Sequence, residues 1–343
     1  MTDRARHEGA GLMRTPAFWS RPPGAPGLAA RALTPLGWVY AAGTARRLAR
    51  GTGEAPGVPV ICVGNINAGG TGKTPTTIDL MMRLSARGIA AHVVTRGHGG
   101  SLDGPVRVEE RRHTAAETGD EPLLLSAFGP VWVAKDRRAG AQAAVAAGAR
   151  AILLDDGFQD PSLAKDLSLV VVDATVGFGN GRCIPAGPLR EPVATGLARA
   201  DLLLSVGPPQ AQAAFADRWG RLLGLPHLSG QLSPLETGMD WQGTRFLAFA
   251  GIGHPSKFFA TLRGLGAELA ETRALSDHQP LTPALMARLE RDAAAARAQL
   301  VTTEKDAVRL PAAFRSKVIT LPVRLALDDP APLDRELDRL FPK

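Results

Sequence analysis

The feature that most constrains the fold of this chain is the segment VICVGNINAGGTGKTPTT, residues 60–77. An apolar run typical of a β-strand leads into a glycine-rich turn, and a stretch of helix length follows the tripeptide Gly-Lys-Thr. This order of strand, loop and helix is typical of a phosphate-binding loop (P-loop) in an α/β protein. The usual motif, G-x-x-x-x-G-K-[ST], begins with glycine, and Asn67 stands at that position here. Because asparagine visits positive φ more readily than other non-glycine residues, we expect the first turn of the loop to form with Asn67.

The backbone and side chains of this loop predict a nucleotide site. Glycine lets backbone N–H groups surround phosphate oxygens where a side chain would leave no room. Lys73 is expected to bridge the β- and γ-phosphates, and the Thr74 hydroxyl is expected to bind Mg²⁺. The predicted nucleotide-binding residues are Asn67, Ala68, Gly69, Gly70, Thr71, Gly72, Lys73 and Thr74.

A second phosphate-site element should be an apolar strand that ends in a carboxylate. The segment AILLDDGFQD, residues 151–160, supplies it with Asp155 and Asp156. One of these carboxylates, together with Thr74, would hold Mg²⁺, and the sequence leaves open which of the two touches the metal. The two motifs predict hydrolysis of a nucleoside triphosphate or transfer of its phosphate, without identifying an acceptor.

Short apolar runs alternate with segments of helix length after residue 57. They are almost continuously apolar, as expected of parallel strands that helices cover on both faces. The predicted fold class is α/β: a P-loop NTPase-like core with a mostly parallel sheet covered by helices, a smaller C-terminal α/β domain and an N-terminal amphipathic helical segment. We expect the N-terminal segment and its linker at 1–56, the core at 57–238 and the smaller domain at 239–343. The expected strands include 58–63, 90–96, 130–135, 151–156, 166–173 and 200–206 in the core, and 245–252, 299–303 and 317–323 in the smaller domain.

The N-terminal segment carries most of the net charge of the chain. Residues 1–57 hold eight arginines against three acidic residues, a net charge of +5 out of +7 for the whole chain. Residues 32–45 contain no charge, but this run is too short to span a bilayer and is interrupted by proline and glycine. Residues 28–50 either form a helix at a membrane surface, with arginines at phosphate headgroups, or a helix docked on the protein's own core. The side chains expected to face the lipid are Leu33, Leu36, Trp38, Tyr40 and Leu48.

Composition disfavours several other functions. Cys62 and Cys183 make no disulfide framework and lack metal-ligand spacing, so nothing points to an oxidising compartment. The basic segment interleaves arginine with aliphatic residues and accompanies no recognised nucleic-acid motif, so nucleic acid is not an expected partner.

Eight longer segments are unusual enough to be compared with known families. They are VGNINAGGTGKTP (63–75), TRGHGG (95–100), TGDEPLLL (118–125), ILLDDGFQD (152–160), GFGNGRCIPAGPLREP (177–192), AFAGIGHPSKFF (248–259), LSDHQPLT (275–282) and VTTEKDAVRL (301–310). In content and order they resemble the tetraacyldisaccharide 4'-kinase family of Gram-negative bacteria. The resemblance implies that ATP, with Mg²⁺, donates its γ-phosphate to the 4'-hydroxyl of tetraacyldisaccharide 1-phosphate, which gives lipid IVA. In this family a small polar residue is typical at the position of Asn67, so the loop looks like the family's own P-loop variant.

The resemblance also implies an Asp–His pair that activates the acceptor hydroxyl. The matching residues are Asp120 in GDEP and His278 in SDHQP. The carboxylate would accept the hydroxyl proton, and the imidazole would orient the carboxylate or relay the proton. Gln279 replaces a histidine that commonly follows the first one, and His98 stands where tyrosine is commoner. These departures weaken any scheme that needs both histidines but leave the Asp–His pair intact.

Two arginines are candidates for contact with the substrate. Arg182 and Arg190 lie in the Gly- and Pro-rich segment 177–192. Because a guanidinium fork suits phosphate, contact with the lipid 1-phosphate or with ATP is one interpretation. The other is a role in loop packing, with Arg190 paired to an acidic residue.

The resemblance places the protein at the cytoplasmic face of the inner membrane as a peripheral protein and favours the interfacial interpretation of residues 28–50. The expected partners are the lipid substrate and the anionic membrane surface, and no obligatory protein partner is inferred. Two alternatives remain open. A P-loop kinase of a soluble sugar or metabolite would not need residues 28–50, and a P-loop ATPase switch with a protein partner would hydrolyse ATP without an acceptor.

Overall fold

The computed structural model describes residues 16–342, which form two compact units. The larger unit comprises residues 18–237 and 322–342, and the smaller unit comprises residues 16–17 and 238–321 of the described range. Residues 1–15, the first part of the predicted N-terminal segment, lie outside the described range. Among the helices in that range, none combines the length and the hydropathy needed to cross a membrane.

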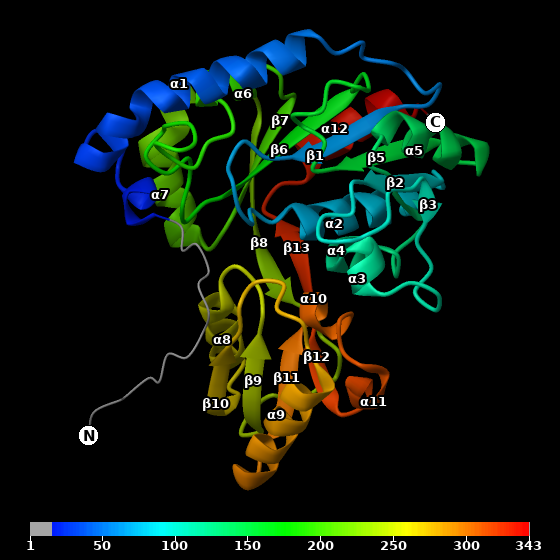
Figure 1. Ribbon diagram of the computed structural model, residues 1–343, viewed down its shortest axis with the longest axis vertical. Helices are drawn as coiled ribbons and strands as arrows, with labels where there is room; N and C mark the ends of the chain where they lie inside the picture. The colour runs from blue at the N-terminus through cyan, green and yellow to red at the C-terminus, as the bar shows by residue number, and fades with distance from the viewer. Residues whose placement is uncertain (1–15, 343) are drawn as a thin grey trace. The chain divides into compact units, whose positions relative to one another are not determined.

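The larger unit is built on a nine-stranded sheet in the order β13-β8-β7-β6-β1-β5-β2-β4-β3 (Figure 1). Neighbouring strands are parallel except at the two edges, where β13 and β3 run antiparallel to their neighbours. Strands β1, β5, β6 and β7 are buried along their whole length, which explains why their sequences are apolar without alternation. The predicted α/β class with a mostly parallel sheet is confirmed. The strands are β1 (Val60–Gly64), β2 (Ala91–Thr95), β3 (Val106–Arg107), β4 (Val131–Val133), β5 (Ala151–Asp155), β6 (Leu167–Asp173), β7 (Leu202–Val206), β8 (His227–Pro234) and β13 (Val323–Leu327).

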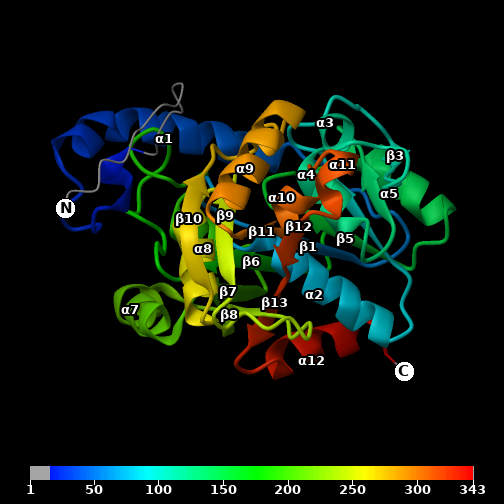
Figure 2. The same cartoon turned by 90° about the horizontal axis from the view of Figure 1, so that it is seen from below.

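Helices cover both faces of this sheet. Helices α5, α6 and α7 share one apolar core with the sheet, in which Phe178 and Phe215 are fully buried. On the other face α2 and α12 lie side by side (Figure 2), where Arg83 of α2 and its C-cap residue Arg87 pair with Asp334 of α12 at 3.2 and 2.8 Å. The helices are α1 (Leu28–Ala49), α2 (Lys73–Ala86), α3 (Ala115–Thr118), α4 (Asp120–Leu125), α5 (Arg137–Ala146), α6 (Val193–Leu197), α7 (Pro209–Trp219) and α12 (Ala331–Leu340), with 3-10 turns η1 (Ala17–Ser20) and η2 (Gly220–Leu222).

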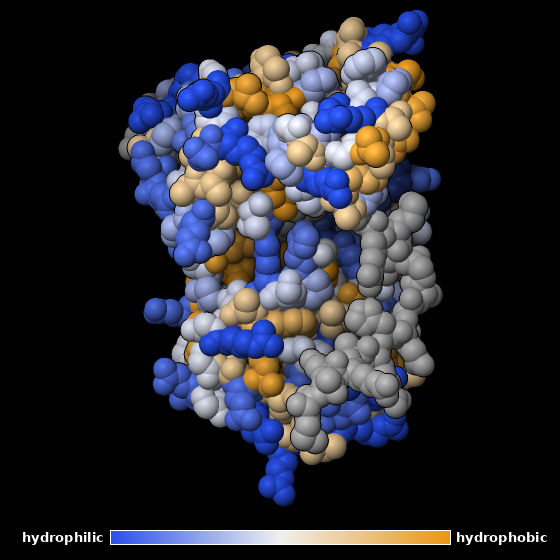
Figure 3. All heavy atoms as spheres, turned by 90° about the vertical axis from the view of Figure 1, so that its left-hand side faces the viewer, coloured by the Kyte–Doolittle hydropathy of each residue, from blue (hydrophilic) through white to orange (hydrophobic). Residues whose placement is uncertain are grey.

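Helix α1 has one face docked on the protein and another apolar face exposed. At Gly37 an added Cβ would lie 2.9 Å from the carbonyl oxygen of Cys183, so the two backbones are in close contact. Leu33 and Leu48, which were expected to face outward, are half-buried. Figure 3 looks from the side where α1 begins and shows apolar surface among charged residues at the upper end. The outward apolar side chains, with their exposed fractions, are Leu28 (84%), Leu36 (56%), Trp38 (69%), Val39 (70%) and Tyr40 (39%).

The smaller unit holds a four-stranded parallel sheet in the order β10-β9-β11-β12. Its core contains Leu247 and Phe249 of the sheet with Met286 and Leu289 of a covering helix. The elements are β9 (Arg245–Ala250), α8 (Pro255–Gly264), β10 (Glu268–Ala274), α9 (Pro283–Ala295), β11 (Gln299–Thr303), α10 (Glu304–Ala307), α11 (Ala312–Arg315) and β12 (Val318–Leu321).

The end of the chain returns to the larger sheet, although its sequence had suggested a place in the smaller domain. The single strand expected at 317–323 is divided at Pro322 into β12 and β13. Proline has no backbone N–H, so it interrupts the hydrogen bonding of a strand. Strand β13 then pairs with β8, and α12 buries Leu333 and Leu337, which joins residues 322–342 to the larger unit.

Candidate functional site

The P-loop lies between β1 and α2 of the larger unit. Gly69 and Gly72 have φ values of 111° and 99°, a region that side chains disfavour. Gly72 is the N-cap of α2 and makes no side-chain capping bond, so the N–H groups of the first helical turn are available to a ligand. Thr74 is in this first turn, directly after Lys73. The N-terminus of a helix favours an anion, and this loop is therefore suited to phosphate.

Asn67 does not adopt positive φ, so the reason inferred from the sequence for asparagine at this position is wrong, although the loop forms. Asn67 forms an isolated β-bridge with Leu189 and donates from Nδ2 to the carbonyl oxygen of Gly177 at 3.0 Å. Its side chain is buried, so it ties the start of the loop to the segment that carries Arg190. Among the described non-glycine residues, positive φ occurs at Asp156, His278 and Arg297.

Asn65 also shapes the loop and was not predicted from the sequence. It is fully buried, and its Nδ2 donates to the carbonyl oxygen of Gly69 and to Thr71 Oγ1, both at 3.2 Å. The available signal was a polar residue directly after a fully apolar strand. Asn65 thus stabilises the loop through two hydrogen bonds from its buried side chain.

Asp155 lies beside the P-loop strand, because β5 pairs with β1 so that Asp155 is level with Val63. Its Oδ2 accepts a hydrogen bond from Thr95 Oγ1 at 3.3 Å, and its Oδ1 accepts one from Thr77 Oγ1 at 3.5 Å. Burial, reinforced by the negative charge of Glu121, raises the pKa of Asp155 to about 7. A buried carboxylate of this kind is stabilised in its charged form by a nearby cation, which fits the oxygen ligands that Mg²⁺ prefers.

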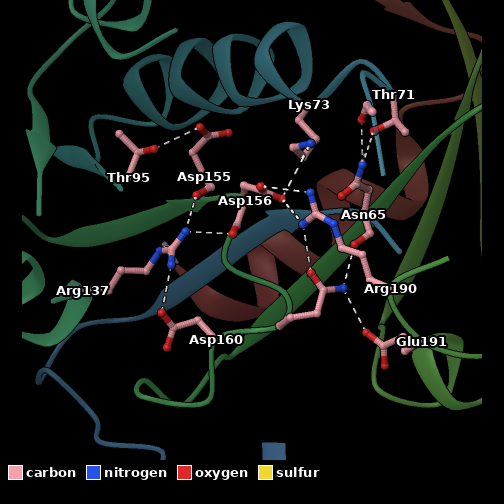
Figure 4. A network of polar contacts seen from close by, with 12 residues as sticks. Asn65, Thr71, Lys73, Thr95, Arg137, Asp155, Asp156, Asp160, Arg190 and Glu191 are labelled. Carbon is pink, nitrogen blue, oxygen red and sulfur yellow. Dashed lines mark hydrogen bonds and ion pairs between the residues drawn. The ribbon is translucent and has the colours of Figure 1, made fainter. Parts of the chain in front are cut away.

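Asp156 joins two cations at the start of α2, as Figure 4 shows. Its Oδ1 lies 3.6 Å from Lys73 Nζ and 3.0 Å from Arg190 Nη1. Burial alone would raise the pKa of Asp156, but the positive charges of Lys73 and Arg190 outweigh it and hold the pKa below its usual value. The structure therefore brings together three of the residues that the sequence had singled out.

Two further residues hold this cluster in place and were not predicted. Arg137 is buried and donates to the carbonyl oxygens of Asp155 and Asp156 at 3.2 and 2.8 Å. Gln159 accepts from Arg190 Nη1 at 3.1 Å and donates to the carbonyl oxygen of Asn65 at 2.8 Å. Arg190 is thereby linked both to the carboxylate and to the base of the loop.

Arg182 has a different environment from Arg190. Its Nη1 donates to Thr34 Oγ1 of α1 at 2.9 Å. Arg182 thus contacts the docked face of α1, whereas Arg190 contacts the carboxylate beside the P-loop.

Asp120 is the first residue of α4, which packs against α2, and it is 4% exposed. Gly119 before it has a φ of 90°, and an added Cβ would lie 2.6 Å from the carbonyl oxygen of His98. The segments TRGHGG and TGDEP are therefore in close backbone contact within the larger unit.

His278 belongs to the smaller unit, in the loop between β10 and α9. Its φ is 58°, its side chain is 39% exposed, and its Nε2 lies 3.5 Å from Lys305 Nζ. Asp120 and His278 therefore lie in separate units.

The fold and the site define a P-loop enzyme that binds a nucleotide, with the cations Lys73 and Arg190 both in contact with Asp156. A family model described as tetraacyldisaccharide-1-P 4'-kinase matches residues 29–342. The chain belongs to this family, whose members are kinases of lipid A biosynthesis, so the resemblance seen in the sequence is confirmed.

Similar proteins cover nearly the whole chain. A tetraacyldisaccharide 4'-kinase of Dinoroseobacter shibae is 69% identical over 331 residues, which is 96% of this chain and 98% of that protein. The corresponding protein of Rhodospirillum rubrum is 46% identical over 329 residues, again 96% of this chain and 98% of that protein. A crystal structure of the "apo" form of LpxK from Aquifex aeolicus in complex with ATP is similar with a TM-score of 0.75 and 25% identity, covering 92% of this chain and all of that one.

Proposed function

We propose that this protein transfers the γ-phosphate of ATP to the 4'-hydroxyl of tetraacyldisaccharide 1-phosphate and so forms lipid IVA. The observation that carries the proposal is the cluster of Lys73, Asp156 and Arg190 beside the P-loop. Phosphoryl transfer depends mainly on positioning and on neutralising the charge of the transferred group, and two cations at this place serve both needs.

The nucleotide is bound by residues 67–74, with the amides of the loop and of the α2 N-terminus around its phosphates. Lys73 contacts the β- and γ-phosphates, as the corresponding lysine does in other P-loop enzymes, and Arg190 adds a second positive charge. The Thr74 hydroxyl and the Asp155 carboxylate would hold Mg²⁺, which supplies charge neutralisation on the phosphate oxygens. Asp156 has a different role: it holds Lys73 and Arg190 in place, since both cations contact its carboxylate.

The acceptor hydroxyl is activated by Asp120, with His278 orienting the carboxylate or relaying the proton. Asp120 is supported as the base because α4 places this buried carboxylate on an element that packs against the P-loop helix. His278 is supported by its exposed imidazole on a constrained turn of the smaller unit. Of the two arginine candidates, Arg190 is better supported for a phosphate contact than Arg182, which is bound to α1.

The outward face of α1 supports contact with the cytoplasmic surface of the inner membrane. Trp38 and Val39 are about 70% exposed, and Arg31 and Arg46 flank the apolar run. Exposed apolar side chains next to arginines suit an interface of acyl chains and anionic headgroups. We assign residues 1–56 to this membrane-associating segment, and the lipid substrate would be taken from the same surface.

The kinase proposal is tested with radiolabelled ATP and tetraacyldisaccharide 1-phosphate in mixed micelles. Wild type should give labelled lipid, and both Lys73→Ala and Asp120→Ala should lose it. Lys317→Ala, a surface change that removes an exposed ion pair to Glu290 and a cation–π contact with Phe314, should retain it. Absence of labelled lipid with the wild type would refute the proposal, and ATP hydrolysis without any acceptor would favour an ATPase switch instead.

The membrane proposal is tested by sedimentation with vesicles that contain phosphatidylglycerol. The double change Trp38→Glu and Val39→Glu should abolish co-sedimentation, because it places charge where the acyl chains would lie. Leu222→Glu changes a side chain of similar exposure on η2 and should leave binding intact. These changes are preferable to deletion of residues 1–50, since α1 also buries one face against the protein. Equal binding of all three proteins would contradict the proposal.

A further inference from the structure

His278 has a backbone conformation that is unfavourable for histidine. Its φ of 58° is in the left-handed region, which costs free energy for a residue with a Cβ and persists only where the surroundings hold it. Its amide donates to the carbonyl oxygen of Gly251 at 3.2 Å. Gln279, at the position where the family commonly has a second histidine, closes the turn by accepting from the Ser276 amide at 3.0 Å. Because the backbone sets the direction of the Cα–Cβ bond of His278, whatever holds this turn also limits where the ring can lie.

Arg309 holds the turn from both sides. Its Nη1 donates to the carbonyl oxygen of Gln279 at 2.8 Å, and its Nη2 donates to the carbonyl oxygen of Gly251 at 3.0 Å. The Arg309 guanidinium therefore binds two carbonyl groups next to His278. One belongs to Gly251 and accepts the hydrogen bond of the His278 amide, and the other belongs to Gln279, which follows His278 in the chain. The donors of a guanidinium lie in a fixed plane, so they constrain both carbonyls together in a way that a lysine ammonium does not.

Asp306 orients Arg309. It is fully buried, forms a short ion pair with Arg309 Nη2, and accepts from the Gly251 amide with both carboxylate oxygens at 3.1 Å. Thr303, the N-cap of α10, also donates to it from Oγ1 at 2.8 Å. An added Cβ on Gly251 would lie 3.0 Å from Arg309 Nη2, which explains the glycine. A buried ion pair is weak support for stability in itself, and in some proteins buried polar groups specify one conformation.

We infer that the Asp306–Arg309 pair is a positioning device for His278. It fixes the turn of residues 276–279 so that the imidazole is presented in one orientation, and α10, which carries Asp306, also brings Lys305 to 3.5 Å from the ring. The inference rests on the proposed function, in which His278 assists Asp120.

A double-mutant cycle in the full chain tests this inference. Arg309→Lys keeps the charge but loses the planar fork, so we expect kcat at saturating ATP and lipid to fall about tenfold or more, with the KM for ATP unchanged. In a His278→Ala background the same change should alter kcat by less than about twofold, because the group that it positions is gone. Arg315→Lys is the matched control: Arg315 is in the same unit and donates to the carbonyl oxygen of Leu310, outside the turn. Equal losses in both backgrounds would overturn the inference, since they would mean that Arg309 acts through folding alone.

Hydrogen exchange measured by mass spectrometry gives a readout that does not depend on activity. Peptides covering residues 275–282 should exchange faster in Arg309→Lys than in wild type or Arg315→Lys, because the His278 amide bond to Gly251 is loosened. Unchanged exchange would overturn the positioning role even if Arg309→Lys lowers kcat. If His278→Ala has the kcat of wild type, the catalytic half of the inference is refuted. Failure of the wild type to phosphorylate lipid refutes the proposed function, and the exchange experiment then still decides whether Arg309 holds the turn.

Discussion

Restoring the usual glycine of the P-loop motif should weaken this protein. The change Asn67→Gly converts NINAGGTGKT to the strict motif, and a comparison of motifs alone would expect better nucleotide binding. In the structure Asn67 is not a left-handed loop residue. It is a buried residue that bridges to Leu189 and bonds to Gly177.

The size of the effect follows from these contacts. Loss of the Nδ2 bond leaves the Gly177 carbonyl without that donor, which costs about 1–3 kcal/mol. Asn67 Oδ1 is buried with no partner among the described residues, so its removal returns about 1 kcal/mol. The net loss of unfolding free energy is about 1 kcal/mol for Asn67→Ala. Glycine adds about 0.5–1 kcal/mol of backbone entropy, so about 2 kcal/mol is expected for Asn67→Gly.

The assay is urea unfolding of wild type, Asn67→Ala and Asn67→Gly, together with the KM for ATP. We expect stability to decrease in that order and the KM to rise, because the base of the loop loses its attachment to the segment that carries Arg190. The alanine variant separates the lost hydrogen bond from the added backbone freedom. An Asn67→Gly protein that is as stable as wild type, or that binds ATP more tightly, would refute the reasoning.

Two further predictions follow from the ionisable groups. Burial raises the pKa of Cys62 to about 12 and that of Cys183 to about 11, so neither thiol should react with a thiol reagent at pH 8 until urea unfolds the chain, and reaction of either in the native protein would contradict the structure. Burial also raises the pKa of Asp155 from 3.8 to about 7, so the folded state holds this proton more tightly than the unfolded chain and ionisation lowers stability as the pH rises through that window. The free energy of unfolding of Asp155→Asn, measured relative to wild type, should therefore increase by roughly 1–3 kcal/mol from pH 5 to pH 8 in Mg²⁺-free buffer. The same variant should lose phosphoryl transfer. Urea unfolding of both proteins at pH 5 and at pH 8 measures the change. A difference in unfolding free energy that is the same at the two pH values would count against the prediction.

The parts of the fold that were predictable depend on local pattern. The strand-loop-helix of the P-loop and the strand that ends in Asp155 and Asp156 can be recognised from consecutive residues, because apolar runs and glycines act on their immediate neighbours. The parallel sheet followed from the same runs. Adjacency of β1 and β5 then brought the two motifs together.

The parts that were not predictable depend on distant contacts. The conformation of Asn67 is set by Gly177, which is 110 positions away in the chain. Arg137 had no motif of its own and matters only because α5 brings it to the carbonyls after β5. The return of residues 322–342 to the larger sheet depends on Pro322 and on the free edge of β8, which is a property of the folded sheet.

The most direct measurement of the central claim is the structure of the product. Wild-type protein is incubated with ATP, Mg²⁺ and tetraacyldisaccharide 1-phosphate, and the lipid is analysed by mass spectrometry and by ³¹P–¹H correlation NMR. We expect one added phosphate, attached at the 4' position, in the wild type and none with Lys73→Ala. Consumption of ATP with unchanged lipid, or a phosphate at any other position, would contradict the account.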